Sequence, residues 1–407
     1  MPNHKVFNDP TNPLAARLYD NNCFAQSFVQ TASTDLRVEG LTAQAAWSFI
    51  YNINTTLVNT AITGSGSITQ SNSQAVLQTG AAISSSAQVQ SRRFSRHMPG
   101  LGLHFVGAAI FTAGVSGSTQ LIGLGDSNNG LFFGYNGTSF GVMRRQNGTD
   151  NWIPKASWNG DKLNGQGLSG ITLDTTTGNI YVIKLLWLGF GLITFAVINP
   201  STGLEIVVHR IQNGNTSTTP SVFSPNLPLM ALVSNTTNST NVTLKTPSAA
   251  VYLEGEATNA NTAFNAVGNN SVSISSNVET NLISLQNKST VSSITNRVPV
   301  KLQALSLYAN GGQNVAIRLL RNATLSGTTT YTDIDSTNSV AAYNTAGTYN
   351  SGTGIFIVGF QLQKLDTQNY NLVDYDFIIQ PTETMTVTAL SAGTSSIAAT
   401  LSWREYY

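Results

Sequence analysis

Residues Lys155–Arg210 read KASWNGDKLNGQGLSGITLDTTTGNIYVIKLLWLGFGLITFAVINPSTGLEIVVHR, and this stretch decides the fold class. It holds an apolar run, Val182–Ile198, interrupted by a lysine (Lys184), a threonine and the pair Gly189 and Gly191. A membrane-spanning helix needs about 20 mostly apolar residues with few or no charges. The run is shorter, charged, and rich in the β-branched and aromatic residues that favour strands. We therefore interpret it as the centre of a β-sheet and reject a membrane span.

Turn signals divide the stretch into three strands. Thr-Gly-Asn precedes the apolar run and Asn-Pro-Ser-Thr-Gly follows it, and both are turn sequences. We predict strands over Ile180–Leu188 and Leu192–Ile198, joined at Gly189–Gly191, and a third strand over Leu204–Ile211. Such a meander belongs in the core of a sandwich.

Composition points the same way. The chain has 407 residues, of which 41% are hydrophobic and only 10% are charged. Soluble domains usually contain about 25% charged residues. Abundant Ser, Thr, Asn and Gly with many Val, Ile and Leu is typical of all-β proteins with many turns. A surface this poor in charge also suits burial in a large assembly, where charges are costly to desolvate.

The pattern predicts three parts. Residues 1–62 read as an N-terminal attachment arm, within which Leu41–Ala61 is either a short helix or irregular. Residues 63–257 read as a central β-sandwich of lectin-like or jelly-roll type. Residues 258–407 read as a linker followed by a C-terminal β-sandwich, because the segment from about 258 to 296 is polar and of low complexity. No βαβ rhythm appears, which disfavours parallel α/β folds.

Charge and cysteine content exclude several function classes. The net charge is +1, which gives no electrostatic footprint for nucleic acid or membrane. The basic stretch Arg92–His97 is assigned to a strand end or a subunit contact. The single cysteine, Cys23, cannot form an internal disulfide, which suits assembly in a reducing cytoplasm. The N-terminus lacks the apolar segment of a signal peptide.

No catalytic or cofactor motif stands out. The four histidines show no metal-ligand spacing, and neither a nucleophile elbow nor a phosphate-binding loop is present. A glycosidase needs two carboxylates about 5–10 Å apart. Candidates after folding are Asp126, Asp150, Asp161, Asp174 and Glu205, but aspartates in turns are usually structural. We predict no catalytic residue, no metal and no cofactor.

One loop is a candidate for ligand binding. Trp152, Trp158, Asn159 and Asp161 combine aromatic rings with an amide and a carboxylate, which could bind a sugar or Ca²⁺. The structural alternative is that Asp161 forms an Asx-turn that holds the loop and that both tryptophans lie in the core. Both interpretations stay open on the sequence.

Two long segments carry ordered motifs. Ser91–Arg210 contains, in order, SRRFSRHMPG, GLGDSNNGLFF, WNGDKLNGQGLSGITLD, YVIKLLWLGFG and VVHR. The segment around Val298–Trp403 contains RVPVKLQALSLY, VAIRLLRNATLSG and TLSWREYY. Together they resemble a recurrent architecture in structural proteins of tailed bacteriophages and other large DNA viruses. Those relatives often have a Pro-Gly-Asp-Thr turn where this chain has Pro-Thr-Glu-Thr at Pro381–Thr384, which puts the geometry of that turn in question.

The resemblance implies a non-enzymatic virion structural protein: a capsid-associated, decoration or fibre component. It would be assembled in the host cytoplasm and located in the virion. Its partners would be other virion proteins and copies of itself, in an oligomer for which a trimer is one arrangement. No nucleic acid and no membrane are expected as partners. The alternative function is a module of a viral fibre or tail that binds a host glycan or receptor, with the sandwich loops recognising a surface glycan.

Overall fold

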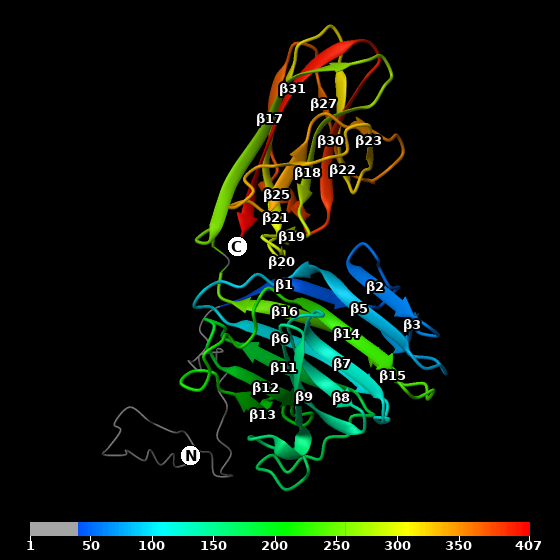
Figure 1. Cartoon of the computed structure of the whole chain (residues 1–407), viewed down its shortest axis with the longest axis vertical. Helices are drawn as coiled ribbons and strands as arrows, with labels where there is room; N and C mark the ends of the chain where they lie inside the picture. The colour runs from blue at the N-terminus through cyan, green and yellow to red at the C-terminus, as the bar shows by residue number, and fades with distance from the viewer. Residues whose placement is uncertain (1–39, 257) are drawn as a thin grey trace, which may run out of the picture. The chain divides into compact units, whose positions relative to one another are not determined.

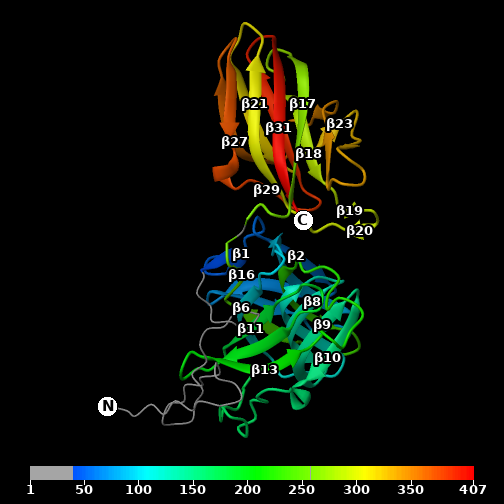
Figure 2. The same cartoon turned by 90° about the vertical axis from the view of Figure 1, so that its left-hand side faces the viewer.

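The computed structural model describes residues 40–256 and 258–407, and strands dominate it throughout (Figures 1 and 2). The chain divides into two compact units, Met1–Ala257 (unit 1) and Thr258–Tyr407 (unit 2). Helix in the described residues is limited to two short 3-10 turns, η1 (Lys155–Ser157) and η2 (Val373–Tyr375). None of the described helices has the length and hydropathy needed to cross a membrane. The all-β prediction is confirmed.

Unit 1 contains a sheet of nine strands. Its main path runs β13-β12-β11-β6-β15-β4-β3, while β16 pairs with β6 and with β1. The strands are β1 (Leu41–Ser48), β3 (Ser67–Ser71), β4 (Gln74–Gln78), β6 (Leu103–Phe111), β11 (Asn179–Leu185), β12 (Ile193–Ile198), β13 (Glu205–Ile211), β15 (Thr243–Thr246) and β16 (Ser248–Glu254).

The stretch that decided the fold class supplies three neighbouring strands of this sheet. β11, β12 and β13 pair antiparallel in sequence order, as predicted, and β11 also pairs with β6. The corner between β11 and β12 needs its glycines. Gly189 has a φ of +77°, and a Cβ on Gly191 would collide with the carbonyl oxygen of Leu186.

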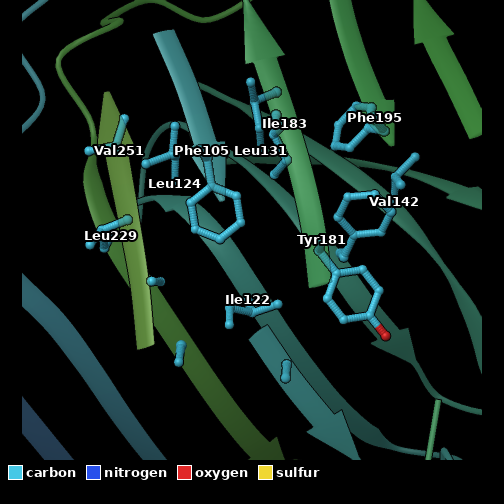
Figure 3. Packing of buried hydrophobic residues seen from close by; sticks show 14 of the residues in the cluster. Phe105, Ile122, Leu124, Leu131, Val142, Tyr181, Ile183, Phe195, Leu229 and Val251 are labelled. Carbon is cyan, nitrogen blue, oxygen red and sulfur yellow. The ribbon is translucent and has the colours of Figure 1, made fainter. Parts of the chain in front are cut away.

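The second sheet of unit 1 has seven strands in the order β10-β9-β8-β7-β14-β5-β2. They are β2 (Val58–Thr63), β5 (Ser85–Phe94), β7 (Ser118–Gly125), β8 (Gly130–Asn136), β9 (Ser139–Gln146), β10 (Thr149–Pro154) and β14 (Pro228–Asn235). Side chains from both sheets form one continuous core, among them Phe105, Leu131, Tyr181 and Phe195 (Figure 3). Aromatic rings meet edge to face there, such as Phe133 and Phe195 with centroids 5.4 Å apart.

Part of the predicted N-terminal arm belongs to the sandwich. β1 pairs with β16 over Leu41–Ser48, and β2 pairs with β5 over Val58–Thr63. Trp47, Phe49 and Val58 are buried in the core of unit 1. The expectation of a helix or irregular chain over Leu41–Ala61, and an arm boundary at residue 62, are therefore corrected. The rest of the predicted arm, with Cys23, lies in residues 1–39, outside the described residues.

Unit 2 is a second sandwich. A five-stranded sheet has the path β17-β31-β21-β28, with β29 also on β21, and a six-stranded sheet has the order β24-β25-β18-β30-β22-β27. The first is built from β17 (Thr262–Ile274), β21 (Val300–Ala309), β28 (Thr367–Asn371), β29 (Ile378–Ile379) and β31 (Ser395–Tyr406). The second is built from β18 (Thr280–Asn287), β22 (Val315–Arg321), β24 (Thr332–Asp333), β25 (Ala341–Asn344), β27 (Ile355–Leu362) and β30 (Thr384–Ser391). Two small ladders join β19 (Thr290–Val291) to β20 (Ile294–Thr295) and β23 (Leu325–Ser326) to β26 (Thr348–Tyr349).

Of the polar segment from about 258 to 296, we expected the early part to be a linker and the later part to hold the first strands of the C-terminal domain; strand begins already at Thr262. β17 occupies Thr262–Ile274 and pairs along its length with β31, with one irregularity after Asn269. Its Asn, Ser and Gly residues lie mainly on the exposed side of the strand, which explains why the sequence looked structureless. The division between the two units nevertheless falls between residues 257 and 258, where the composition changes.

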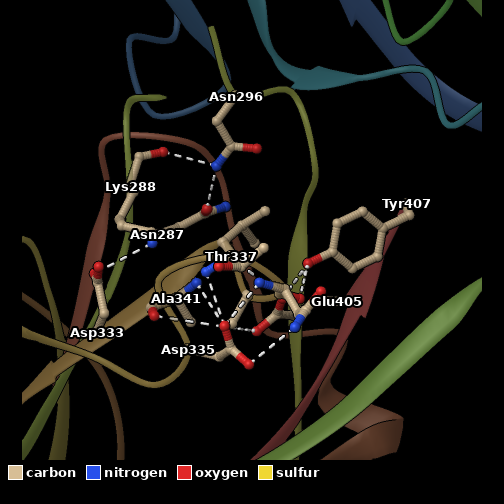
Figure 4. A network of polar contacts seen from close by, with 12 residues as sticks. Asn287, Lys288, Asn296, Asp333, Asp335, Thr337, Ala341, Glu405 and Tyr407 are labelled. Carbon is tan, nitrogen blue, oxygen red and sulfur yellow. Dashed lines mark hydrogen bonds and ion pairs between the residues drawn. The ribbon is translucent and has the colours of Figure 1, made fainter. Parts of the chain in front are cut away.

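A buried carboxylate ties the last strand of unit 2 to a neighbouring loop (Figure 4). Glu405 is fully buried and accepts hydrogen bonds from the Ser339 hydroxyl (2.6 Å), the Val340 N–H (2.9 Å) and the Trp403 indole (3.0 Å). The Tyr407 hydroxyl donates at 2.8 Å to Oε2, the oxygen that also accepts the Val340 N–H. A buried charge is tolerated when its oxygens are satisfied in this way.

The turn at Pro381–Thr384 differs from the glycine-containing turn of the proteins that the sequence resembles. Thr382 has a φ of +77°, which is the left-handed region that glycine adopts freely. Its N–H donates to the Asn287 carbonyl at 2.9 Å, and the Glu383 carboxylate accepts the Gln380 N–H at 3.0 Å. The glycine-type geometry is thus retained with a threonine in place.

Candidate functional site

The predicted ligand-binding loop closes one open side of the unit 1 sandwich. It leaves β10, the edge strand of the seven-stranded sheet, and leads to β11 in the nine-stranded sheet. On the way it runs beside β13, the edge strand of that second sheet. The Gly160 N–H donates to the Val208 carbonyl (2.9 Å), and the Asp161 N–H donates to the Val207 carbonyl (3.0 Å). An otherwise free sheet edge is therefore covered by this loop.

Asn159 acts as one more rung of that ladder. Its side-chain oxygen accepts the Arg210 N–H at 2.8 Å, and its side-chain nitrogen donates to the Arg210 carbonyl at 2.8 Å. Its own N–H donates to Nδ1 of His209 at 3.2 Å. Both ends of the Asn159 amide are thus used to hold β13.

Asp161 holds the loop in its observed shape. Its two carboxylate oxygens accept the N–H groups of Leu163 and Ser169, each at 2.8 Å. Burial alone would raise the pKa of the Asp161 carboxyl, but hydrogen bonds from Ser169 and Leu163 hold that pKa below its usual value. A side chain on Gly167 would collide with this carboxylate, so glycine is required there. Asp161 therefore forms an Asx-turn, as the structural alternative predicted.

Trp158 is part of the core. Only 2% of its surface is exposed, and its ring meets Phe133 and Phe140 edge to face, with centroids 6.4 and 6.2 Å apart. A ring in this position has no free face for a sugar. Of the two alternatives left open by the sequence, the structural one therefore holds for Trp158, which packs in the core, and stacking on a ligand is excluded.

Trp152 lies on the other face of the seven-stranded sheet. It is half-buried and packs with Leu121, Phe132, Met143 and Met230, which form a cluster separate from the main core. Phe133 and Val142, the chain neighbours of Phe132 and Met143, point into the main core instead. The structure therefore places Trp152 and Trp158 on opposite faces of the sheet, and the four predicted residues do not converge on one ligand.

The surroundings of Trp152 define a surface that the sequence did not reveal, which we call the outer face. The cross-strand register aligns one residue from each of six strands in a row: Trp152, Met143, Phe132, Gly123, Met230 and Gln90. The next row contains Gly141, Gly134, Leu121, Leu232 and Gln88. Gln90 crosses the sheet and donates to the Gly125 carbonyl at 3.1 Å. This face combines an aromatic ring, amides and strand positions without side chains.

Arg145 borders the outer face. Its guanidinium lies over the Phe132 ring, 5.7 Å from the centroid, and forms a two-pronged pair with Asp150 at 2.6 and 3.0 Å. It also donates to the Asp126 carbonyl at 2.9 Å. Asp150 is therefore a partner of Arg145.

The other carboxylates considered for hydrolysis are also engaged. Asp126 accepts the N–H groups of Asn128 and Asn129 at 2.7 and 2.9 Å. The hydroxyl and N–H of Thr176 bond to Asp174 and lower the pKa of that carboxyl. These are turn aspartates in the ordinary sense. The described contacts do not bring any two of the five candidate carboxylates together.

Lys184, the charge that interrupts the apolar run, belongs to a buried polar cluster. Its ammonium lies 2.7 Å from Glu205. His104 lies with its two ring nitrogens 3.7 Å from Glu205 and 3.6 Å from Glu254. Sequence reasoning missed this cluster because its members come from four strands that are distant in the chain. Register alone brings Lys184 opposite His104.

The basic stretch Arg92–His97 turns partly inward. Arg96 and His97 are buried, and His97 meets Trp187 edge to face at 5.1 Å. Burial lowers the pKa of His97 to about 4. Arg92 donates to the Thr55 carbonyl at 2.8 Å. In residues 40–256 and 258–407, no three His, Cys, Asp or Glu side chains are grouped to hold a metal ion.

No protein-family model and no curated protein sequence matches this chain. Several solved structures resemble about half of it. A glycosyl hydrolase family protein from Mycobacterium fortuitum has a TM-score of 0.37 at 10% identity, covering 52% of this chain and 99% of its own. Lectin II from Ulex europaeus has 0.33 at 11% identity, with 52% and 99% covered. The metal-free Emp46p carbohydrate recognition domain has 0.34 at 8% identity, with 54% and 100% covered. At these scores the likeness carries no argument about ligand or activity.

Proposed function

We propose that this chain is a non-enzymatic structural component of a virus particle, of the capsid-associated, decoration or fibre kind. The observation that carries the proposal is how the residues of the candidate loop use their side chains. Asn159 and Asp161 spend their polar atoms on the chain's own backbone, and Trp158 fills the core. A loop held this way closes the sandwich and makes it more rigid, which suits a structural protein of a virus particle.

Two further features support the same role. The five carboxylates examined for hydrolysis include turn aspartates and members of ion pairs, which favours a protein without hydrolytic activity. The two segments that resemble viral structural proteins include the central strands of both units, β11 and β12 in unit 1 and β21, β22 and β31 in unit 2. The proposed partners are other virion proteins and further copies of this chain.

Particles purified on a density gradient from infected cells test the role directly. Mass spectrometry is expected to find the chain at a fixed ratio to the shell protein, and cryo-EM is expected to show both sandwiches at a repeated position. Absence of the chain from particles would contradict the role. So would particles that lack the chain and remain unchanged in composition and infectivity.

A second candidate function is binding of a host glycan, and the outer face favours it. Sugars stack on aromatic ring faces, and Trp152 on β10 provides one. Gln88 and Gln90 on β5 provide amides five strand spacings away, about 24 Å, so only a glycan long enough to span the sheet contacts both groups. All three side chains are partly exposed. This candidate differs from the loop site expected from sequence, because it uses Trp152 without Trp158.

A glycan array with the full chain tests this candidate. Binding is expected to be lost in Trp152→Ala and largely retained in Trp152→Phe, which keeps an aromatic face. Asn151→Ala, at the exposed neighbouring position on β10, is the matched control and is expected to bind as the unsubstituted chain does. No glycan retained by the unsubstituted chain, or equal binding by Trp152→Ala, would remove the outer face from consideration.

A further inference from the structure

β27 is an edge strand with an unusual composition. It stands at the end of the six-stranded sheet of unit 2 and pairs on one side with β22. In the described part of the chain no strand pairs with its other side. Its sequence is IFIVGFQL, in which six of eight residues are apolar and none is charged or proline. Free backbone N–H and C=O groups along such a strand are a template for pairing with another strand.

The other long sheet edges carry features that discourage pairing. β10 contains Asp150 and Pro154, and β13 is covered by residues 159–161. β17 and β28 are rich in Asn, Gln, Ser and Thr, and β24 is two residues long. β3 is short and mostly polar, β2 is short with three polar residues of six, and β1 pairs with β16 through a bulge between Ala43 and Ala45. Charge, proline, cover and brevity are the usual protections of a sheet edge. β27 has no charge or proline and is eight residues long, and its one cover within the described residues is the Tyr370 hydroxyl, which donates to the Gln361 carbonyl at 3.4 Å near the end of the strand.

Apolar side chains are exposed along the same side of unit 2. Ile355 and Phe356 on β27 are 51% and 59% exposed. A register shift between Leu319 and Leu320 brings Phe356 opposite Leu320, and its ring lies close to Gly359. Leu365, in the turn that follows β27, is 68% exposed.

The neighbouring edge of the other sheet extends this surface. Phe360 on β27 stacks on Tyr370 of β28 with centroids 4.0 Å apart, so the two edges lie side by side. Tyr375, in η2 just beyond β28, is 54% exposed. Large apolar side chains exposed on neighbouring strands favour an interaction site.

We propose that β27 is the contact through which two copies of this chain pair, strand to strand, about a two-fold axis. Antiparallel pairing joins the two six-stranded sheets into one sheet of twelve strands, six from each copy. Ile355, Phe356 and their symmetry mates are covered in the process. The proposal deepens the assembly role proposed above by naming the surface and the partner.

The sequence of β27 favours a second copy of the chain as its partner. In a two-fold antiparallel pair each β27 meets the same apolar, uncharged sequence, so no charge is buried without a partner. A different partner would need an edge strand that is equally apolar on both faces. Among the described strands, β1, β17 and β27 are the long edge strands without charge or proline, and β27 has the most apolar sequence of the three.

The oligomeric state of the full chain tests the contact. Light scattering coupled to size-exclusion chromatography is expected to give twice the mass of the chain, and Phe356→Lys is expected to give the mass of one chain. Because Phe356 is exposed within the single copy, the lysine should leave the thermal midpoint of the Phe356→Lys monomer at or slightly below that of the dimer. Ile294→Lys, at a position that is 70% exposed on β20, is the matched control and is expected to remain dimeric.

A monomeric unsubstituted chain across a dilution series would overturn the proposal. So would an oligomer that Phe356→Lys leaves intact, because its contact would then lie elsewhere. Hydrogen exchange adds a direct reading, since amides of β27 should exchange faster in Phe356→Lys than in the unsubstituted chain. Dimers that are absent from virus particles would refute the particle role and leave the contact standing. A monomeric chain found in particles would refute the β27 contact and leave the particle role standing.

Discussion

Thr382 adopts a backbone conformation that a β-branched residue avoids. Its φ of +77° is kept by the N–H bond to Asn287 and by the Glu383 carboxylate on the Gln380 N–H. The left-handed region costs a non-glycine residue roughly 1–2 kcal/mol. The proteins that this chain resembles often have glycine at that place. The sequence analysis singled out this turn because it lacks the expected glycine, and the structure places Thr382 of the same turn in a strained conformation.

We predict that Thr382→Gly stabilises unit 2. Relief of strain outweighs the extra entropy that glycine has in the unfolded chain, so the free energy of unfolding should rise by up to about 1 kcal/mol. Urea denaturation followed by fluorescence measures it. Thr367→Gly, on β28 with ordinary strand geometry, is the control and should lower stability. A less stable Thr382→Gly would show that the threonine side chain contributes more than the strain costs.

Asp161 gives a prediction in pH. Its folded pKa lies below the ordinary value of 3.8, so its ionised form stabilises the loop above that pH. This contribution is lost as the pH falls through the lower pKa of the folded state. Asp161→Asn should therefore cost about 1–2 kcal/mol at pH 7, because one oxygen acceptor is replaced by a donor. The gap between variant and unsubstituted chain should shrink below pH 3.8. An equal gap at both pH values would contradict the charged role.

The two tryptophans show what a sequence pattern can and cannot resolve. Trp152 and Trp158 are six residues apart, and in an unbroken strand this even spacing would place both rings on one face. η1 at Lys155–Ser157 interrupts the strand, so one ring faces outward and the other enters the core. A single turn of 3-10 helix is too short to leave a clear signal in the sequence. For that reason the four candidate residues do not form one binding site.

Strands with an apolar face could be predicted from the sequence. Strands that form because a neighbouring strand pairs with them could not. β11, β12 and β13 lie where the apolar pattern and the turn residues placed them. β17 is polar along most of its length and is a strand because β31 offers it a full ladder of hydrogen bonds. Tertiary pairing overrides local preference in such edge strands.

The cover over β13 is an element-scale feature that can be tested. Asn159→Ala removes both side-chain hydrogen bonds to Arg210, which should expose the β13 edge to solvent. Amide exchange at Arg210 is expected to accelerate, by about tenfold for each 1.4 kcal/mol lost in local opening. Asn151→Ala on β10 serves as control and should leave β13 exchange unchanged. Unaltered exchange in Asn159→Ala would mean that Gly160 and Asp161 hold the edge without it.

At the scale of the whole molecule, each unit has its own hydrophobic core. One cluster is drawn from the strands of unit 1, and another, centred on residues such as Leu302, Ile317 and Trp403, is drawn from those of unit 2. The sequence located the division near residue 257 through the change in composition. It could not locate the start of the first sandwich, because β1 and β2 pair with strands more than 20 residues away in the chain.

We predict that residues 258–407 fold when expressed alone. The core and both sheets of unit 2 are contained in that range, so the isolated segment should unfold cooperatively and show a near-ultraviolet signal from buried Trp403. Circular dichroism with thermal melting measures both. A segment with strand content but no cooperative transition would show that unit 2 needs unit 1 to fold.

The place of β31 has a consequence for how unit 2 is made. This last strand lies between β17, the first strand of the unit, and β21. On the ribosome, every earlier strand is synthesised before the one that joins the two ends of the unit. The five-stranded sheet must therefore form after translation of the unit is finished, by long-range pairing, which is slow. Until then the apolar faces of β21 and β27 are open to other nascent chains, so synthesis at low temperature or with a chaperone should raise the soluble yield.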